Sequence, residues 1–366
     1  MLVVVKVGSS TLVNASGALD RSYIKNLCDQ VSNLIVAGHK PIIVSSGAAA
    51  VGRERLGFSS RPSDIPSLQA CAAAGQAALT EAYAVVLAEH GIPCAQVLLT
   101  RRDVVDREGY LNARNTFERL LALGAVPVVN ENDTVSVAEF AFGDNDMLGA
   151  IVSALVGADL YVICSDVEGL YTANPQSDPT ATLVEHVERI DAKVSQMAGG
   201  SGSSFGTGGM ASKLRAARAM LVAGIPTVIC QGKEERVVER VVAGEAVGTR
   251  FEAPEGSSHG TARKMWIGLA EMPQGSLVLD EGACRAVLER GASILPVGVI
   301  RAEGAFTAGD VVNVLSEKGD LLGRGVTRYS SEDITRVQGL KLDVIARFMP
   351  EKEGQPAIHR DELLVF

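Results

Sequence analysis

Short apolar runs alternate with longer stretches rich in alanine and leucine over roughly the first 250 residues of the chain. The apolar runs have the length and composition of buried strands, and they are Leu2–Val7, Pro41–Val44, Ile92–Leu99, Val126–Val129, Leu160–Cys164 and Pro226–Cys230. The stretches of helical length between most of them include Ser67–His90, Asn112–Leu123, Asp146–Val156 and Ser212–Ala223. This alternation predicts an α/β fold in which helices cover both faces of a mainly parallel sheet. Ligands of such sheets bind beyond the carboxyl ends of the strands.

The composition changes after Arg250. Residues 251–260 are rich in Gly, Ser and Pro, which is typical of a linker. Shorter apolar runs separated by turn residues then predict a small, mostly β domain, and they are Gly275–Asp280, Ile294–Val299, Asp310–Leu315 and Leu321–Val326, with a helix expected over Glu281–Arg290. The expected divisions are a first domain over 1–252, a linker region over 253–272, a second domain over 273–352 and a C-terminal tail over 353–366.

Charge and cysteine content argue against several classes of protein. The formal net charge of −9 disfavours broad nucleic-acid binding, because a phosphate backbone attracts an excess of Lys and Arg. The six cysteines are scattered without a C-x-x-C pair, and no His/Cys pair has zinc spacing, so we expect reduced thiols and no protein-bound metal centre. No secretory signal and no apolar run near the ~18 residues of a membrane helix are visible, which predicts a cytoplasmic protein that does not bind membranes.

A lysine lies near the end of the first predicted strand. Lys6 precedes Gly8 in the run Val3–Ser10, and a lysine buried there is costly unless an anion meets it. That anion is either a phosphate or a structural carboxylate. A second predicted strand runs into the small residues of Ser45–Ala50, which either open a helix toward an anion or form an ordinary helix cap.

Two clusters rich in acids and amides follow the fourth predicted strand. They are Asn130–Asp133 and Phe142–Asp146, at a strand end and a helix start. Such clusters at the carboxyl edge of a sheet suit an ammonium group, the orientation of lysines or a metal. Aspartate at a helix start is also a common cap, so each single residue has a structural alternative.

A glycine-rich stretch, Gly199–Gly209, leads directly into an alanine-rich helix with Lys213 in its first turn. A lysine there opposes the usual preference for acids at helix N-termini, and a bound phosphate would remove the conflict. We favour a nucleotide phosphate loop over a flexible linker. Residues 206–211 match G-x-G-x-x-A but do not follow a strand directly, and Ser212 occupies the place of the last Walker A glycine.

Taken together, these segments resemble the amino-acid kinase family. The matching motifs, in chain order, are Lys6–Ser10, Ser45–Ala48, Leu111–Arg114, Asn130–Asp133, Gly143–Asp146, Gly169–Ala173 and Gly206–Met210. Within the family, the chain is similar to the enzymes whose acceptor is the side chain of free L-glutamate. Their usual C-terminal appendage is a PUA domain, which residues 275–351 resemble. The resemblance therefore implies the amino-acid kinase fold followed by a small PUA-like domain.

The resemblance assigns roles by position. It implies that Lys6 and Lys213 contact the transferred phosphoryl group and that Asp146 orients both lysines. Glutamate would be held by Ser46, Asp133 and Asn145, with Asp144 nearby. The residues implied at the nucleotide are Lys6, Ser165, Asp166, Thr207, Gly208, Gly209, Met210, Ala211, Ser212 and Lys213. Some relatives have Thr where this chain has Ser165, and the hydroxyl group is kept.

The implied reaction is ATP-dependent phosphorylation of the glutamate side chain to L-glutamyl 5-phosphate, with Mg²⁺ as the metal, as the first step of proline biosynthesis. Glutamate is ionised at neutral pH and needs no general base. The residues alone also admit aspartate or an acylated glutamate, so an acetylglutamate kinase or aspartokinase is the alternative. The resemblance further implies a homo-oligomer (dimer or tetramer), proline as a feedback inhibitor and glutamyl-phosphate reductase as a partner. An RNA-binding PUA protein is a remote alternative, because residues 257–366 carry a formal net charge of −2.

Overall fold

The computed structural model describes residues 1–14, 18–100, 103–104, 107–136, 145–198, 209–252 and 273–365. The chain divides into two compact units, Met1–His259 and Gly260–Phe366. The region predicted as a linker, residues 253–272, lies outside the described residues.

The first unit is built on one eight-stranded sheet. Its strands are β1 (Leu2–Val7), β2 (Lys40–Val44), β3 (Cys94–Leu99), β4 (Val126–Glu131), β5 (Leu160–Ser165), β6 (His186–Val187), β7 (Thr227–Gln231) and β8 (Thr249–Phe251). They lie in the order β3-β4-β2-β1-β5-β7-β8-β6. All neighbours are parallel except β7 and β8, which are antiparallel. The predicted α/β class with a mainly parallel sheet is confirmed.

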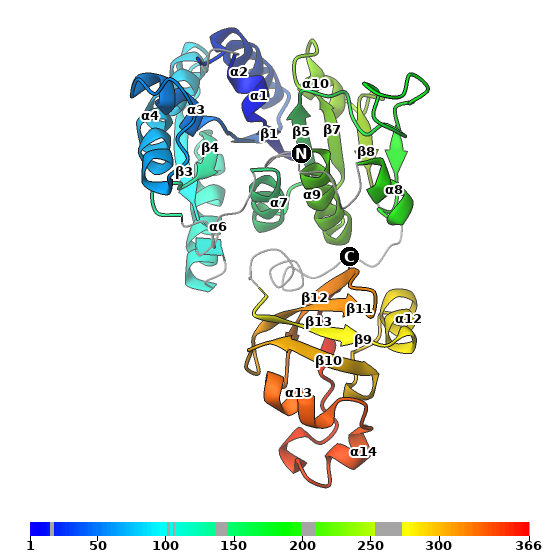
Figure 1. Ribbon diagram of the computed structural model, residues 1–366. Helices are drawn as coiled ribbons and strands as arrows, with labels where there is room; N and C mark the ends of the chain where they lie inside the picture. Colours follow the sequence, from blue (N-terminus) through cyan, green and yellow to red (C-terminus); the bar gives the residue numbers. More distant parts are fainter. Residues whose placement is uncertain are drawn as a thin grey trace. The chain divides into compact units, whose positions relative to one another are not determined.

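Helices cover both faces of this sheet (Figure 1). They are α1 (Ser9–Leu12), α2 (Arg21–Val36), α3 (Ala48–Arg55), α4 (Ile65–Glu89), α6 (Arg107–Ala122), α7 (Asn145–Val156), α8 (Ala192–Met197), α9 (Met210–Ala223) and α10 (Val237–Val242). One layer contains α2, α4 and α10, and the other contains α6, α7 and α9. A sheet covered on both sides explains why β1 reads as a run of valines, since Val3, Val4 and Val5 are fully buried.

Two glycines bring α3 and α4 into backbone contact. A Cβ atom on Gly52 would lie 1.7 Å from the carbonyl oxygen of Cys71, and one on Gly75 would lie 1.9 Å from that of Ala48. Because no side chain fits at either position, the crossing holds the start of α3 at a fixed place beside α4.

One helix is an exception to the expected absence of a membrane-length segment. By length and composition α4 could cross a membrane, although half of its most apolar window is buried inside the first unit. It packs against α2, α3 and β3, and its side chains Leu79, Tyr83 and Leu87 are fully buried. These contacts are those of a core helix of the first unit.

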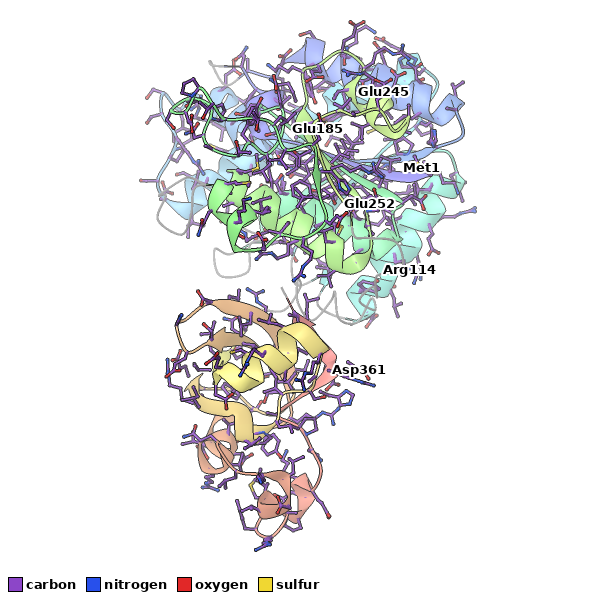
Figure 2. All side chains as sticks on the ribbon, turned by 90° about the vertical axis from the view of Figure 1, so that its right-hand side faces the viewer. Met1, Arg114, Glu185, Glu245, Glu252 and Asp361 are labelled. Atoms are coloured by element: carbon purple, nitrogen blue, oxygen red, sulfur yellow. The ribbon has the colours of Figure 1, made fainter. Side chains whose placement is uncertain are left out.

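The second unit contains a five-stranded sheet of β9 (Gly275–Leu279), β10 (Val299–Gly304), β11 (Val311–Ser316), β12 (Leu321–Thr327) and β13 (Ile358–Val365). The order is β10-β9-β11-β12-β13, with β9 and β11 parallel and the other pairs antiparallel. The remaining elements are α12 (Glu281–Arg290), α13 (Ser331–Val337), α14 (Leu342–Ile345) and two 3₁₀ turns, Pro296–Gly298 and Pro350–Lys352. In both units side chains fill the space between sheet and helices, and charged residues such as Arg114, Glu245 and Asp361 lie outside (Figure 2).

Two expectations for this unit need correction. The run Ile294–Val299 is not a strand: Pro296 lacks a backbone N–H and begins a 3₁₀ turn, so β10 begins only at Val299. The expected tail after residue 352 also contributes to the sheet, because β13 pairs with β12 along its edge. The predicted helix Glu281–Arg290 is present, and the Asp280 carboxylate accepts the Ala283 N–H at 2.7 Å to cap it.

Candidate active site

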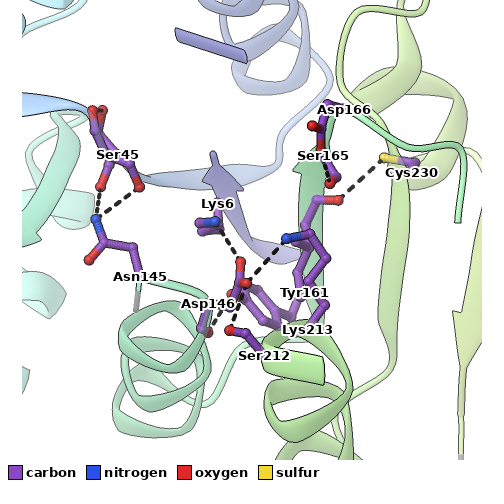
Figure 3. Close-up of polar contacts among 12 residues, drawn as sticks. Lys6, Ser45, Asn145, Asp146, Tyr161, Ser165, Asp166, Ser212, Lys213 and Cys230 are labelled. Atoms are coloured by element: carbon purple, nitrogen blue, oxygen red, sulfur yellow. Dashed lines mark hydrogen bonds and ion pairs between the residues drawn. The ribbon is translucent and has the colours of Figure 1, made fainter. Parts of the chain in front are cut away.

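Polar side chains gather where the central strands of the first unit end (Figure 3). Lys6 lies near the end of β1 and Ser165 ends β5, which is its neighbour in the sheet. Ser45 follows β2 directly on the other side of β1. Because parallel strands end at one edge, residues from distant parts of the sequence meet there, and α7 and α9 add side chains from their first turns.

Two lysines share one buried carboxylate at this edge. Lys6 Nζ lies 2.5 Å from Asp146 Oδ1, and Lys213 Nζ lies 3.4 Å from Asp146 Oδ2. The Ser212 hydroxyl donates to Oδ2 at 3.0 Å. Asp146 is 0% exposed, and Lys6 and Lys213 are 4% and 6% exposed. The three residues form the charge cluster of the site, and the predicted convergence of the two lysines on Asp146 is present.

The charge cluster carries a formal charge of +1. Burial favours the protonated form of Asp146, but the two ammonium groups and the hydrogen bonds to the carboxylate outweigh this effect and hold its pKa below the ordinary value. A negatively charged ligand would offset this excess of positive charge among the three buried side chains. The cluster is therefore suited to receive an anion.

The first turn of α9 adds backbone donors beside Lys213. Gly209 is the N-cap of this helix and has an extended backbone. Because glycine has no side chain, it does not cap the first N–H groups of the helix. Free N–H groups and the helix dipole favour an anion at this end. Gly209, Met210, Ala211 and Ser212 thus occupy positions that suit a phosphate. Thr207 and Gly208, which the sequence also assigns to the nucleotide, lie outside the described residues.

A tyrosine that the sequence analysis did not single out fixes the start of α7. The Tyr161 hydroxyl donates to the carbonyl oxygen of Asp146 at 2.7 Å. A Cβ atom on Gly149, one turn along α7, would lie 2.3 Å from that hydroxyl oxygen. Glycine at this position lets the ring approach, and the tyrosine in turn holds Asp146 in place. The only available signal was an isolated glycine inside an otherwise helical pattern.

Neutral polar groups form a second cluster next to the first. The Asn145 side-chain nitrogen lies 2.6 Å from the carbonyl oxygen of Ser45, 2.9 Å from the Ser46 hydroxyl oxygen and 2.9 Å from Asn130 Oδ1, so its two N–H bonds are shared among three acceptors. We call Asn145, Asn130, Ser45 and Ser46 the amide cluster. Its members come from α7, the end of β4 and the turn after β2, where Gly47 adopts a left-handed φ of 87°.

Asp133 is half-buried beyond the end of β4. Burial and the nearby charge of Glu131 raise its pKa to about 6. Within the described part of the chain, no hydrogen bond or ion pair reaches its carboxylate. An unpaired carboxylate in this position suits a cationic group of a ligand. The fourth residue assigned to the substrate, Asp144, lies outside the described residues.

Two further residues assigned to the nucleotide follow β5. The buried Ser165 hydroxyl donates to Oδ1 of the exposed Asp166 at 3.1 Å. With its nitrogen turned toward them, the Gln231 amide at the end of β7 donates to the carbonyl oxygens of Ser165 at 3.0 Å and Asp166 at 3.2 Å. This pair lies one strand away from Lys6.

The described residues contain no group of three or more His, Cys, Asp or Glu side chains that would hold a metal ion by themselves. Mg²⁺ is nevertheless compatible with the site, because this ion commonly binds through substrate phosphates, waters and one or two carboxylates.

Each of the two family matches falls within one unit of the fold. The amino acid kinase family matches residues 1–231, and the PUA domain matches residues 275–349.

Curated relatives match along the whole chain. A glutamate 5-kinase of Geobacter sp. (strain M21) is 44% identical over 363 residues, which is 99% of this chain and 97% of the relative. A glutamate 5-kinase of Gloeobacter violaceus (strain ATCC 29082 / PCC 7421) is 47% identical over 365 residues, which is 99% of this chain and 98% of the relative.

Among solved structures, carbamate kinase from Giardia lamblia bound to AMP-PNP has a TM-score of 0.52 at 15% identity. The match covers 69% of this chain and 98% of that one. At this identity the likeness concerns the fold alone, and it agrees with the sheet and helix layers of the first unit.

Proposed function

The chain belongs to the amino acid kinase family, and from this premise we propose that it is a glutamate 5-kinase. It transfers the terminal phosphoryl group of ATP to the side-chain carboxylate of L-glutamate, giving ADP and L-glutamyl 5-phosphate, the first step of proline biosynthesis. The observation that carries the chemistry is the pair of buried lysines sharing Asp146 at the carboxyl edge of the sheet. The relatives named glutamate 5-kinase, 42–47% identical over 99% of this chain, support the choice of acceptor.

The acceptor needs no activation by a base. Its carboxyl group has an ordinary pKa of about 4.3 and is ionised at neutral pH. One carboxylate oxygen forms a bond to the terminal phosphorus while the bond from that phosphorus to the oxygen of the departing ADP breaks. No proton moves in this step, which agrees with a charge cluster whose carboxylate is held ionised by two lysines.

The main obstacle is the repulsion between a carboxylate and a triphosphate. Lys6 and Lys213 offset this repulsion and stabilise the charge on the migrating phosphoryl group, and Asp146 keeps the two ammonium groups in place. The first turn of α9, from Gly209 to Lys213, receives phosphate oxygens together with Thr207 and Gly208. Bound Mg²⁺ supplies further positive charge to the phosphates. Ser165 and Asp166 contact the nucleotide beside β5.

The amide cluster and Asp133 hold glutamate. Ser46 and the backbone at the start of α3 suit a carboxylate group, and Asn145 Oδ1 offers a hydrogen-bond acceptor. Asp133 suits the ammonium group, because its carboxylate has no partner among the described residues. Asp144 is assigned to the same pocket.

The proposal also includes the location, assembly and inhibition of the enzyme. The enzyme is cytoplasmic and forms a homo-oligomer, a dimer or a tetramer, and its unstable product passes to a glutamyl-phosphate reductase. Proline inhibits by competing in the glutamate pocket. Added proline then raises the apparent KM for glutamate, and no effect at millimolar proline would remove this part of the proposal.

An acceptor panel tests the proposed function. ADP release is measured with ATP and Mg²⁺ in the presence of L-glutamate, L-aspartate or N-acetyl-L-glutamate. We expect glutamate to give the highest kcat/KM. A preference for either other acceptor would instead assign the chain to the corresponding amino-acid kinase.

A further inference from the structure

One face of α4 carries three polar side chains in an otherwise alanine-rich helix. Gln76, Thr80 and Tyr83 are spaced four and three residues apart, which places them on one side of the helix. Gln76 is 9% exposed and Tyr83 is fully buried. Buried polar groups of this kind need partners, and all three side chains have them.

Gln76 extends the amide cluster from Asn130 to α4. Its Oε1 accepts a hydrogen bond from Asn130 Nδ2 at 2.8 Å, and its Nε2 donates to the Thr80 hydroxyl at 3.1 Å. Asn130 is 2% exposed. The hydrogen bonds therefore run in one direction, from Asn145 to Asn130, from Asn130 to Gln76 and from Gln76 to Thr80. We call this chain the amide relay.

The relay, together with the carbonyl oxygen of Ser45, determines which end of the Asn145 amide is left for a ligand. An amide has a donor end and an acceptor end, so each group in the relay limits the orientation of the next. Two hydrogen bonds fix the orientation of the Asn130 amide. Its Oδ1 accepts the Glu131 N–H at 2.9 Å, and its Nδ2 donates to Gln76 Oε1. The Oδ1 atom therefore faces Asn145. Asn145 must then direct its nitrogen into the relay. None of the described residues donates to its own Oδ1, which can accept a hydrogen bond from a ligand.

The position of Gln76 is itself fixed by packing. Its neighbour Gly75 lies against the carbonyl oxygen of Ala48 in the crossing of α3 and α4. Two turns further on, the Tyr83 hydroxyl lies 3.2 Å from the Ser45 hydroxyl. The same helix thus supports the turn after β2 and the end of β4.

We propose that Gln76 is a positioning residue for the amino-acid substrate. Through Asn130 it presents the Asn145 carbonyl oxygen to the ammonium group of the substrate, and Thr80 holds Gln76 in the required orientation. The inference rests on the proposed function, because it concerns affinity for the acceptor. Nucleotide binding uses the other side of the site, so it is independent of the relay.

The experiment compares Gln76→Met with Gln30→Met. Gln30 is a matched control, because it is also buried, donates one hydrogen bond (to Asn26) and accepts one (from the Val238 N–H), and lies in the α2–α10 layer. Loss of a buried hydrogen bond to a positioning group predicts a rise of about 10-fold in the KM for glutamate in Gln76→Met, with kcat and the KM for ATP within about 2-fold of wild type. Gln30→Met should lose thermal stability without changing any of these constants.

A second pair of variants covers the case in which Gln76→Met does not fold. Thr80→Val removes the hydroxyl that accepts from Gln76, whereas Thr80→Ser keeps it. We expect Thr80→Val to raise the KM for glutamate about 3-fold and Thr80→Ser to match wild type.

Unchanged glutamate KM values in Gln76→Met and Thr80→Val, or an equal rise in the KM for ATP, would overturn the inference. A wild-type enzyme that prefers another acceptor would contradict the proposed function instead, and the KM for that acceptor would then test the relay.

Discussion

Asn145 and Asp146 are adjacent at the start of α7, yet they belong to two clusters that are built from different interactions. Asp146 joins two lysines in a buried group of charges. Asn145 joins neutral amides and hydroxyls through short hydrogen bonds. Charges in a buried site act strongly on new charge that develops in a transition state. Neutral hydrogen bonds depend on direction, and they select and orient what binds. We therefore expect the charge cluster to control kcat and the amide cluster to control the KM for glutamate.

The largest expected effect is the loss of either lysine. Lys6→Ala or Lys213→Ala removes one of the two cations facing the migrating phosphoryl group, and kcat should fall by at least about 100-fold. Steady-state kinetics with saturating glutamate and ATP measure this change. Lys233→Ala is the control, because Lys233 is exposed and pairs only loosely with Asp20, at 3.5 Å. Near-normal turnover in either lysine variant would remove that residue from the mechanism.

Asp146→Asn tests the charge cluster through its effect on the stability of the protein. The substitution keeps the shape of the side chain but removes the negative charge that the two buried ammonium groups share. Breaking a buried ion pair in this way costs about 3 kcal/mol in the free energy of unfolding. Because a bound triphosphate restores the missing negative charge, MgATP should stabilise the variant more than the wild type. Thermal unfolding with and without MgATP measures both effects. Equal stabilisation of the two proteins would show that the nucleotide does not meet this cluster.

In the amide cluster, Asn145→Ala should weaken the binding of glutamate. It removes the hydrogen bonds to Ser45, Ser46 and Asn130 and the oxygen offered to the substrate. Loss of hydrogen bonds to a charged ligand predicts a rise of about 10- to 100-fold in the KM for glutamate, with a much smaller change in the KM for ATP. A variant that lowers kcat alone would contradict the division of labour between the clusters.

The smallest effect concerns Asp133 and depends on pH. Its pKa in the folded protein is raised to about 6, above the ordinary value of 3.8, so the folded state holds its proton more tightly than the unfolded state. Stability therefore falls as the pH rises from about 4 to 6, and ionised Asp133 costs the substrate-free protein about 1–2 kcal/mol at pH 7.

Asp133→Asn should remove this cost. The variant should be more stable than wild type at pH 7 but not at pH 4, while its KM for glutamate rises because the ammonium group loses its partner. Denaturant unfolding at the two pH values checks the first expectation. A variant that is less stable at pH 7 would mean that the Asp133 carboxylate has a structural partner.

Most strands of the first unit could be predicted from apolar runs in the sequence. The runs beginning at Leu2, Val126 and Leu160 coincide with buried strands whose faces are both covered, and such strands need no alternation to be recognised. Short or exposed strands were not predicted. β6 has two residues, β8 has three, and β10 is largely exposed, so their sequences contain no pattern that burial would impose.

Some residues of the candidate site could likewise be predicted from the sequence, and others could not. Lys6 and Lys213 stood out because a cation is unusual near a buried strand end or in the first turn of a helix. Gln76 and Thr80 gave no such signal, since a glutamine and a threonine in an alanine-rich helix resemble surface residues until the partner strand is known. Tyr161 was hidden within an apolar strand for the same reason. Residues that act through a second residue are defined by tertiary contacts, which a single sequence does not display.

Trapping the product tests the central claim most directly. An acyl phosphate reacts with hydroxylamine to give a hydroxamate, so the wild-type protein incubated with ATP, Mg²⁺, L-glutamate and hydroxylamine should form glutamyl hydroxamate in step with ADP. Lys213→Ala should lose both products together. Release of ADP by the wild type without any hydroxamate would contradict phosphorylation of the glutamate side chain, and undiminished hydroxamate formation by Lys213→Ala would contradict the role given to the charge cluster.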